Sequence, residues 1–192
     1  MQTQRPRNAA VFAFKPSPSR GGSGGDGVGE IQGPTPHDTE ETMTGASQQF
    51  SIRPARSEDA AALAQLSTQL GYPVDAPAIG ARHAQVRAAD AGEVFVASDA
   101  EGNVIGWTHV VPRLHLEEIP FAELAGLVVL DHARGCGVGA KLLHAAEAWA
   151  KQHGFTRFRV RSNVVRERAH RFYLREGYAE RKRQVVFEKD LA

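Results

Sequence analysis

The sequence has little of what marks several broad classes of protein. It contains 1 cysteine, Cys136, so no disulfide can form within the chain and a reducing cytoplasm is the expected compartment. Its longest apolar stretches, such as residues 127–130, fall far short of the ~20 residues that span a bilayer, so we expect no membrane partner. The 23 Lys and Arg nearly balance the 22 Asp and Glu, and no charge excess favours nucleic acid.

Residues 1–49 have little that could form a core. They hold 8 of the 19 glycines and 5 of the 10 prolines but no tryptophan or tyrosine. Such a composition cannot bury enough apolar surface to offset the entropy lost on ordering. We therefore predict a disordered tail over 1–49, with Met43 as an alternative start, and a globular domain over 50–192. A transit peptide stays open, because the first 25 residues contain Arg and Lys and no acid.

The histidines are scattered, and no pair has the His-x-x-x-His spacing that places two metal ligands on one helical face. We therefore expect no metal site.

The globular part alternates between strand-like and helix-like segments. We expect strands at 50–54, 93–97, 104–111 and 157–161, and helices at 57–70, 77–89 and 166–176. Ser57 is the expected cap of the first helix, and the turn 99–103 closes a hairpin in which Trp107 and His109 share one face. Closing strands are expected from Tyr178, residues 185–188 and Leu191. The order predicts a mixed α/β layer with a mostly antiparallel central sheet.

The chain is organised around residues 123–143. The apolar run 124–130 predicts a buried strand, and turn-forming residues follow it. Glycines then recur where a helix begins, which we predict from apolar residues at three- and four-residue spacing: Val138, Leu142, Leu143, Ala146, Trp149 and Ala150. Unpaired amides at such a helix start suit a phosphate, although glycines also serve turns for purely structural reasons.

Two familiar phosphate motifs do not fit this loop. A Walker-type loop needs a hydroxyl after its lysine, and Lys141 is followed by Leu142. The spacing Gly135-x-Gly137-x-x-Ala140 fits a dinucleotide fingerprint, but the next strand ends without an acid to hold a ribose.

Two motifs resemble the GCN5-related N-acetyltransferase (GNAT) superfamily. Arg134-x-x-Gly137-x-Gly139 is similar to its Q/R-x-x-G-x-G/A signature, and residues 166–178 are similar to its N-x-x-A-x-x-F/L-Y-x-x-x-G-F segment. The resemblance covers residues 50–192. Arg166 replaces the asparagine of many members, and Asn163 lies just upstream as a substitute.

The resemblance implies the GNAT fold, with splayed core strands and helices on both faces of the sheet. It implies that acetyl-CoA binds through its pyrophosphate to the loop residues Arg134, Gly135, Cys136, Gly137, Val138, Gly139 and Ala140. Main-chain groups of Leu127, Val128 and Val129 would bind the pantetheine arm. Cys136 would act through its backbone only, because the family transfers the acetyl group directly.

The resemblance also implies two proton-handling roles. Tyr173 would protonate the departing CoA thiolate, because a phenol with a pKa somewhat above that of the thiol is a nearly matched acid. Glu123 lies eleven residues before Arg134, the offset of the catalytic glutamate in the histone-acetylating branch, and is the candidate base. Period two places Leu127 and Val129 on the face of Glu123.

The sequence therefore predicts an acetyl-CoA-dependent N-acetyltransferase that acts on a primary amine. Small amines, aminoglycoside-like compounds, peptide N-termini and protein lysines all stay open as acceptors, as does a longer acyl donor. A noncatalytic acyl-CoA sensor and a pure interaction module are the alternatives, and a homodimer is left open.

Overall fold

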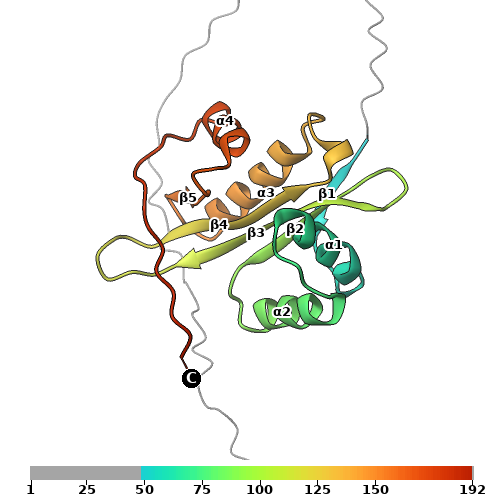
Figure 1. Ribbon diagram of the computed structural model, residues 1–192, viewed down its shortest axis with the longest axis horizontal. Coiled ribbons are helices and arrows are strands. Elements are labelled where there is room, and N and C mark those ends of the chain that lie inside the picture. Colours follow the sequence, from blue (N-terminus) through green and yellow to red (C-terminus); the bar gives the residue numbers. More distant parts are fainter. Residues whose placement is uncertain (1–48, 192) are drawn as a thin grey trace, which may run out of the picture.

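The computed structural model describes residues 49–191. The predicted tail and the alternative start at Met43 lie outside these residues, apart from Gln49. Within the described part, five strands form one sheet in chain order: β1 Ser51–Pro54, β2 Glu93–Ser98, β3 Val104–Arg113, β4 Phe121–Val129 and β5 Phe158–Val160. The helices are α1 Ala60–Leu70, α2 Ala76–Ala88, α3 Val138–Gln152 and α4 Glu167–Arg175 (Figure 1).

The sheet is antiparallel from β1 to β4, and β5 joins β4 in parallel. Leu63 of α1 packs with Val94 and Val96 of β2 on one face. On the other face, Leu143 of α3 packs with Val110 of β3. The predicted mixed, mostly antiparallel sheet with helices on both faces is confirmed (Figure 1).

Local signals in the sequence explain most helix ends. α3 buries the apolar stripe predicted for it except Trp149, which is half-buried, and Gly154 follows the helix end with a φ of 78°. α1 ends at Gly71, whose φ is 101°. The prediction that Ser57 caps the first helix is wrong, because Ser57 lies in the 3₁₀ turn Ser57–Asp59 before α1. At this turn the carboxylate of Asp59 accepts a hydrogen bond from the Arg56 amide at 2.7 Å.

A β-bulge in β4 changes which side chains share a face. His109 of β3 pairs with Gly126, but the next residue, Val110, pairs with Leu124, so Ala125 is an extra residue in β4. Because of this insertion, Glu123 lies on the opposite face from Leu127 and Val129. The expectation that these three residues share a face is wrong, since period two holds only for an uninterrupted strand.

Strands β4 and β5 separate after three residue pairs. β5 pairs with β4 at Ala122, Glu123 and Leu124, and β4 then continues to Val129 without β5 beside it. This leaves one backbone edge of β4 open next to the start of α3.

The predicted closing strands are wrong for this structure. No described residue after β5 belongs to a strand, although residues to Leu191 are described. Residues 185–188 have the composition of a strand, but they pair with no other strand among the described residues. The helices of residues 49–191 lack the length and hydropathy of a membrane span.

Candidate functional site

The loop between β4 and α3 is open and built by two glycines in the left-handed region. Gly135 and Gly137 have φ values of 88° and 82°, and a Cβ on either would meet no atom within 4 Å. This conformation strains any residue with a side chain, which is why glycines stand here. The open space leaves the loop backbone accessible to a ligand.

The first amides of α3, next to this loop, have no helical partners. The first hydrogen bond of the helix runs from the Lys141 amide to the Gly137 carbonyl at 3.1 Å, so the amides of Val138, Gly139 and Ala140 precede it. No side chain caps the helix. Uncapped amides and the positive end of the helix dipole together favour an anion.

The side chain of Arg134 connects the glycine loop to the end of β4. Its Nε donates to the Val129 carbonyl at 3.2 Å, and its Nη1 forms an ion pair with Asp131 at 2.5 Å. Gln69 of α1 donates to the same carbonyl at 2.9 Å. Cys136 is exposed at the tip of the loop, and the side chain of Val138 is buried in the core.

The open edge of β4 presents the backbone of two of the three predicted residues. The Leu130 amide donates to the Ile105 carbonyl of β3 at 2.8 Å. Because successive residues of a strand direct their backbone groups to opposite edges, Val128 faces β3, whereas Leu127 and Val129 face the open edge. Leu127 is therefore placed to bind an extended ligand, and so is the amide of Val129, whose carbonyl already accepts hydrogen bonds from Arg134 and Gln69.

Helix α4 places Tyr173 beside this edge. Tyr173 and Leu127 both pack against the core cluster that contains Leu124, and Phe172 lies 3.7 Å from a Cβ built on Gly139. Among the described residues the Tyr173 hydroxyl has no hydrogen-bond partner. Burial raises the pKa of Tyr173 from 10.0 to about 12, and the charge of Arg166 opposes that rise. Tyr173 therefore stays protonated at neutral pH, but the match with a thiol near pKa ~8.5 is poorer than expected.

The turn before α4 engages Asn163 and Arg166 in local structure. The Asn163 side-chain oxygen accepts a hydrogen bond from the Val165 amide at 3.2 Å. The backbone carbonyl of Asn163 accepts one from the Arg166 amide at 3.0 Å. Arg166 donates to the Leu70 carbonyl at 2.7 Å, which ties the start of α4 to the end of α1.

Glu123 lies on the face of β4 opposite to Leu127 and Val129, where two arginines bind its carboxylate. Its Oε1 accepts hydrogen bonds from Arg113 Nη2 at 2.9 Å and from Arg161 Nη2 at 2.7 Å, and the residue is 3% exposed. Burial alone would raise the pKa of Glu123, but the hydrogen bonds from Arg161 and Arg113 hold the pKa below its ordinary value of 4.5. A carboxylate stabilised in this way is ionised but is a weak base.

The two arginines and a group of buried polar atoms near them were not predicted from the sequence. His83 of α2 and His109 of β3 each have a buried Nε2 without a hydrogen-bond partner in the described part of the protein. Burial, then the charges of Arg113 and His83, lower the pKa of His109. The alternation of Trp107, His109 and Arg113 along one strand face was the available signal.

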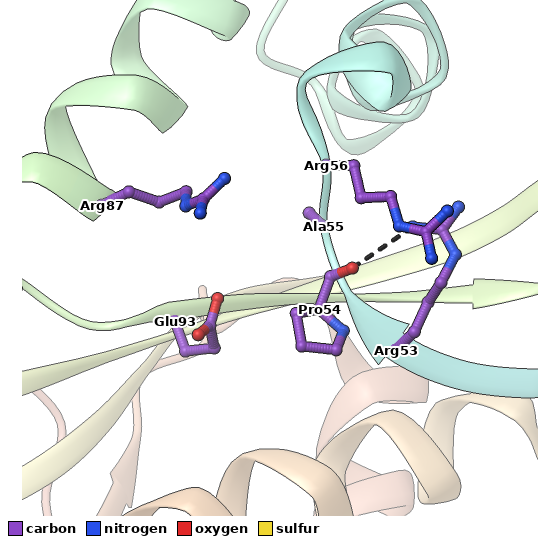
Figure 2. Close-up of a pocket in the computed structure, with 6 residues that line it drawn as sticks. All are labelled: Arg53, Pro54, Ala55, Arg56, Arg87 and Glu93. Carbon is purple, nitrogen blue, oxygen red and sulfur yellow. Dashed lines mark hydrogen bonds between the residues drawn. The ribbon is translucent and has the colours of Figure 1, made fainter.

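A pocket of about 280 Å³ lies away from these residues (Figure 2). It is lined by Arg53, Pro54, Ala55, Arg56, Arg87 and Glu93, from β1, the loop after it, α2 and β2. None of the predicted site residues lines it, so it is separate from the glycine loop.

Comparison with known proteins agrees with this geometry. A family model described as the acetyltransferase (GNAT) family matches residues 60–178, which include β4, the glycine loop and α4. An aminoglycoside N(6')-acetyltransferase type 1 of Stenotrophomonas maltophilia is 34% identical over 145 residues, covering 73% of this chain and 93% of that protein. An aminoalkylphosphonate N-acetyltransferase of Salmonella typhimurium is 41% identical over 78 residues, 40% of this chain and about half, 51%, of that protein.

Solved structures share the fold. The aminoglycoside 6'-N-acetyltransferase AAC(6')-Ih from Acinetobacter baumannii matches with a TM-score of 0.67 at 22% identity, covering 75% of this chain and 100% of that one. The aminoglycoside N-acetyltransferase AAC(6')-Iy, solved with CoA, matches with a TM-score of 0.68 at 21% identity, covering 74% and 96%. The family match, the 34% identical relative and the shared fold lead to one conclusion: the chain belongs to the acetyltransferase (GNAT) family and is an N-acetyltransferase.

Proposed function

We propose that the protein transfers the acetyl group of acetyl-CoA directly to a primary amine of a small molecule. The observation that carries this proposal is the open glycine loop at the uncapped start of α3, beside the open edge of β4 and Tyr173. A phosphate site, a backbone edge for an extended arm and a hydroxyl donor follow one another along one side of the sheet.

The residues present suit CoA. The amides of Val138, Gly139 and Ala140 would bind the pyrophosphate, because they lack helical acceptors and lie at the positive end of the α3 dipole. Gly135 and Gly137 keep the approach clear of side chains. The amide groups of the pantetheine arm would pair with the backbone of Leu127 and Val129 along the open edge.

When bound, acetyl-CoA supplies a thioester carbonyl that an amine can attack. Backbone amides at the open edge of β4 would orient and polarise that carbonyl. The Tyr173 hydroxyl would donate a hydrogen bond to the departing sulfur. Because burial raises the pKa of Tyr173 well above that of a thiol, the hydroxyl stays protonated at neutral pH and would be available as the acid for the sulfur.

The amine must lose its proton before it attacks, and Glu123 is the predicted base. Its place on the face away from Leu127, and its two ion pairs, support a competing hypothesis in which Glu123 orients Arg113 and Arg161. The base assignment stays a prediction, and the pH dependence of a Glu123 variant distinguishes the two roles.

A small-molecule acceptor is favoured by the two curated relatives, whose names specify an aminoglycoside and an aminoalkylphosphonate. The single cysteine supports a reducing compartment such as the cytoplasm.

A panel of amines tests this function. The full chain and acetyl-CoA are incubated with an aminoglycoside, an aminoalkylphosphonate, or a peptide carrying a free lysine, while free thiol and amide product are measured together. We expect one thiol released per N-acetylated molecule with at least one of the two small amines, and none with the same amine already acetylated. Acetylation of the peptide alone would overturn the acceptor class, and thiol release without amide would overturn the transfer reaction.

A further inference from the structure

Four arginines, which we call the arginine strip, lie on the face of the sheet that carries Glu123. Arg157, Arg159 and Arg161 alternate through β5, so period two places them on one face of this strand. Arg113, at the end of β3, reaches the same face, because it binds Glu123 together with Arg161. Strand alternation therefore gathers positive charge on one side of the sheet.

Carboxylates neutralise the arginine strip only in part. Glu118 accepts hydrogen bonds from Arg157 at 3.1 Å and from Arg159 at 2.6 Å. Glu123 accepts those of the other two arginines, and all of them end on its Oε1. Each carboxylate is thus shared by two arginines, and four positive charges against two negative charges leave a net charge of +2 for these six side chains.

Free donors remain at the end of the strip where β5 separates from β4. The last residue pair of these strands is Leu124 with Val160, and Arg161 is the next residue. The side chains of Arg161 and Arg113 are 61% and 39% exposed. Nη1 of Arg113, and Nε and Nη1 of Arg161, donate no hydrogen bond within the described part of the chain. Guanidinium groups with free N–H donors bind carboxylate, phosphate and phosphonate oxygens well.

The amine and acetyl-CoA approach the open edge of β4 from opposite faces of the sheet. Helices α3 and α4 lie on one side of the sheet, and α1 and α2 lie on the other (Figure 1). Tyr173 packs on the side of α3, against the core cluster that contains Leu143. Because α3 and α4 fill that side, an amine reaches an acetyl group at the open edge from the face of Glu123, where Arg161 and Arg113 lie.

We propose that Arg161 and Arg113 bind an anionic group of the acceptor, so that the substrate is a small primary amine that also carries a phosphonate or a carboxylate. This inference rests on the proposed acetyl transfer and specifies its substrate class. The charge of the strip attracts an anionic amine and repels an acceptor with several positive charges, such as an aminoglycoside. Arg161 and Arg113 are therefore the residues that select the acceptor.

Three amines with the same two-carbon chain test the substrate class. 2-Aminoethylphosphonate and β-alanine carry an anionic group, whereas the diethyl ester of 2-aminoethylphosphonate carries none. With the full chain and acetyl-CoA, we expect kcat/KM for the better anionic amine to exceed that for the ester by ~10-fold or more. The comparison of the two anionic amines shows which anion is preferred. Equal or faster acetylation of the ester would overturn this inference and leave acetyl transfer to an amine standing.

Variants of the strip test the residues. Arg161→Gln removes the charge where β4 and β5 separate, and Arg113→Gln removes the second guanidinium. We expect each to lower the preference for the anionic amine over the ester by ~10-fold or more. This ratio cancels the different basicities of the two amines. The control Arg157→Gln removes the same charge from the same strand face, but its partner is Glu118, and we expect the preference to stay within about twofold. An equal loss in Arg157→Gln would overturn the assignment.

Binding measured without turnover separates this inference from the proposed function. Calorimetry follows 2-aminoethylphosphonate binding to the CoA-saturated wild type, Arg161→Gln and Arg157→Gln. We expect the dissociation constant to rise by ~10-fold or more in Arg161→Gln alone. If no amine is acetylated, the proposed function fails, and this binding result still decides the anion site. No binding to the wild type, or equal binding to all three proteins, would overturn the site.

Discussion

Replacing Glu123 by glutamine tests whether the carboxylate serves mainly to hold two arginines. Glu123 Oε1 accepts three hydrogen bonds, from Arg113 Nε at 3.2 Å, Arg113 Nη2 at 2.9 Å and Arg161 Nη2 at 2.7 Å. Glutamine keeps the shape and one acceptor oxygen but removes the charge. A hydrogen bond to a charged group contributes ~1.5–3 kcal/mol. Because the side chains of Arg113 and Arg161 are 39% and 61% exposed, water screens them, and we expect a net loss of ~1–2 kcal/mol in the free energy of unfolding.

The effect of Glu123→Gln on stability should depend on pH with a definite sign. The arginines hold the pKa of Glu123 in the folded protein below its ordinary value of 4.5. The wild type is therefore stabilised by the ionised carboxylate above that value, and it loses this stabilisation as pH falls through the folded pKa. Urea unfolding at neutral pH should show the full difference between the two proteins, and the difference should shrink below pH 4.5.

The matched control is Glu117→Gln, whose side chain is 77% exposed and lies 3.6 Å from His115. We expect this change to alter stability by less than ~0.5 kcal/mol. Equal stability of Glu123→Gln and the wild type at neutral pH would refute the reasoning, as would a difference that does not change with pH. If Glu123 is also the base, the turnover deficit of Glu123→Gln should be largest at low pH and shrink as free amine appears.

Tyr173→Phe should lower kcat by ~10²-fold or more, because it removes the proposed acid. The dissociation constant of acetyl-CoA should change little, because the lost hydroxyl has no hydrogen-bond partner among the described residues. Steady-state kinetics and calorimetry measure the two effects, and a change confined to binding would contradict the assignment. A chain that begins at Met43 should keep the melting temperature and CoA affinity of the full chain, because the composition of residues 1–42 offers no core; a loss of several degrees would show that these residues dock.

The centre of the site was predictable because its signals are local. The change from a β-branched run to three- and four-residue apolar spacing marks the step from β4 to α3. Gly135 and Gly137, between these two elements, have positive φ values that favour glycine. The prediction for Tyr173 came from the resemblance of residues 166–178 to the GNAT segment, and Tyr173 lies in α4 within that segment.

The contacts of Glu123 were not predictable because they depend on distant parts of the chain. The bulge at Ala125 adds a single residue to β4 and reverses the face of Glu123 relative to Leu127, yet nothing in the alternation of this strand reveals it. Arg113 and Arg161 lie 10 and 38 residues from Glu123 and meet it only through strand register. Likewise, residues 185–188 have the composition of a strand, but composition does not specify the edge that a strand joins.

The central claim, that CoA binds at the glycine loop, is tested most directly by titrating CoA into Gly137→Asp and Gly102→Asp. Both glycines have positive φ, 82° and 87°, and open space around the added Cβ, so the two changes impose similar backbone strain and the same charge. Only Gly137 lies where the pyrophosphate would bind. We expect Gly137→Asp to raise the CoA dissociation constant at least tenfold, ~1.4 kcal/mol, and Gly102→Asp to leave it unchanged. Equal CoA affinity in the two folded variants would contradict the claim.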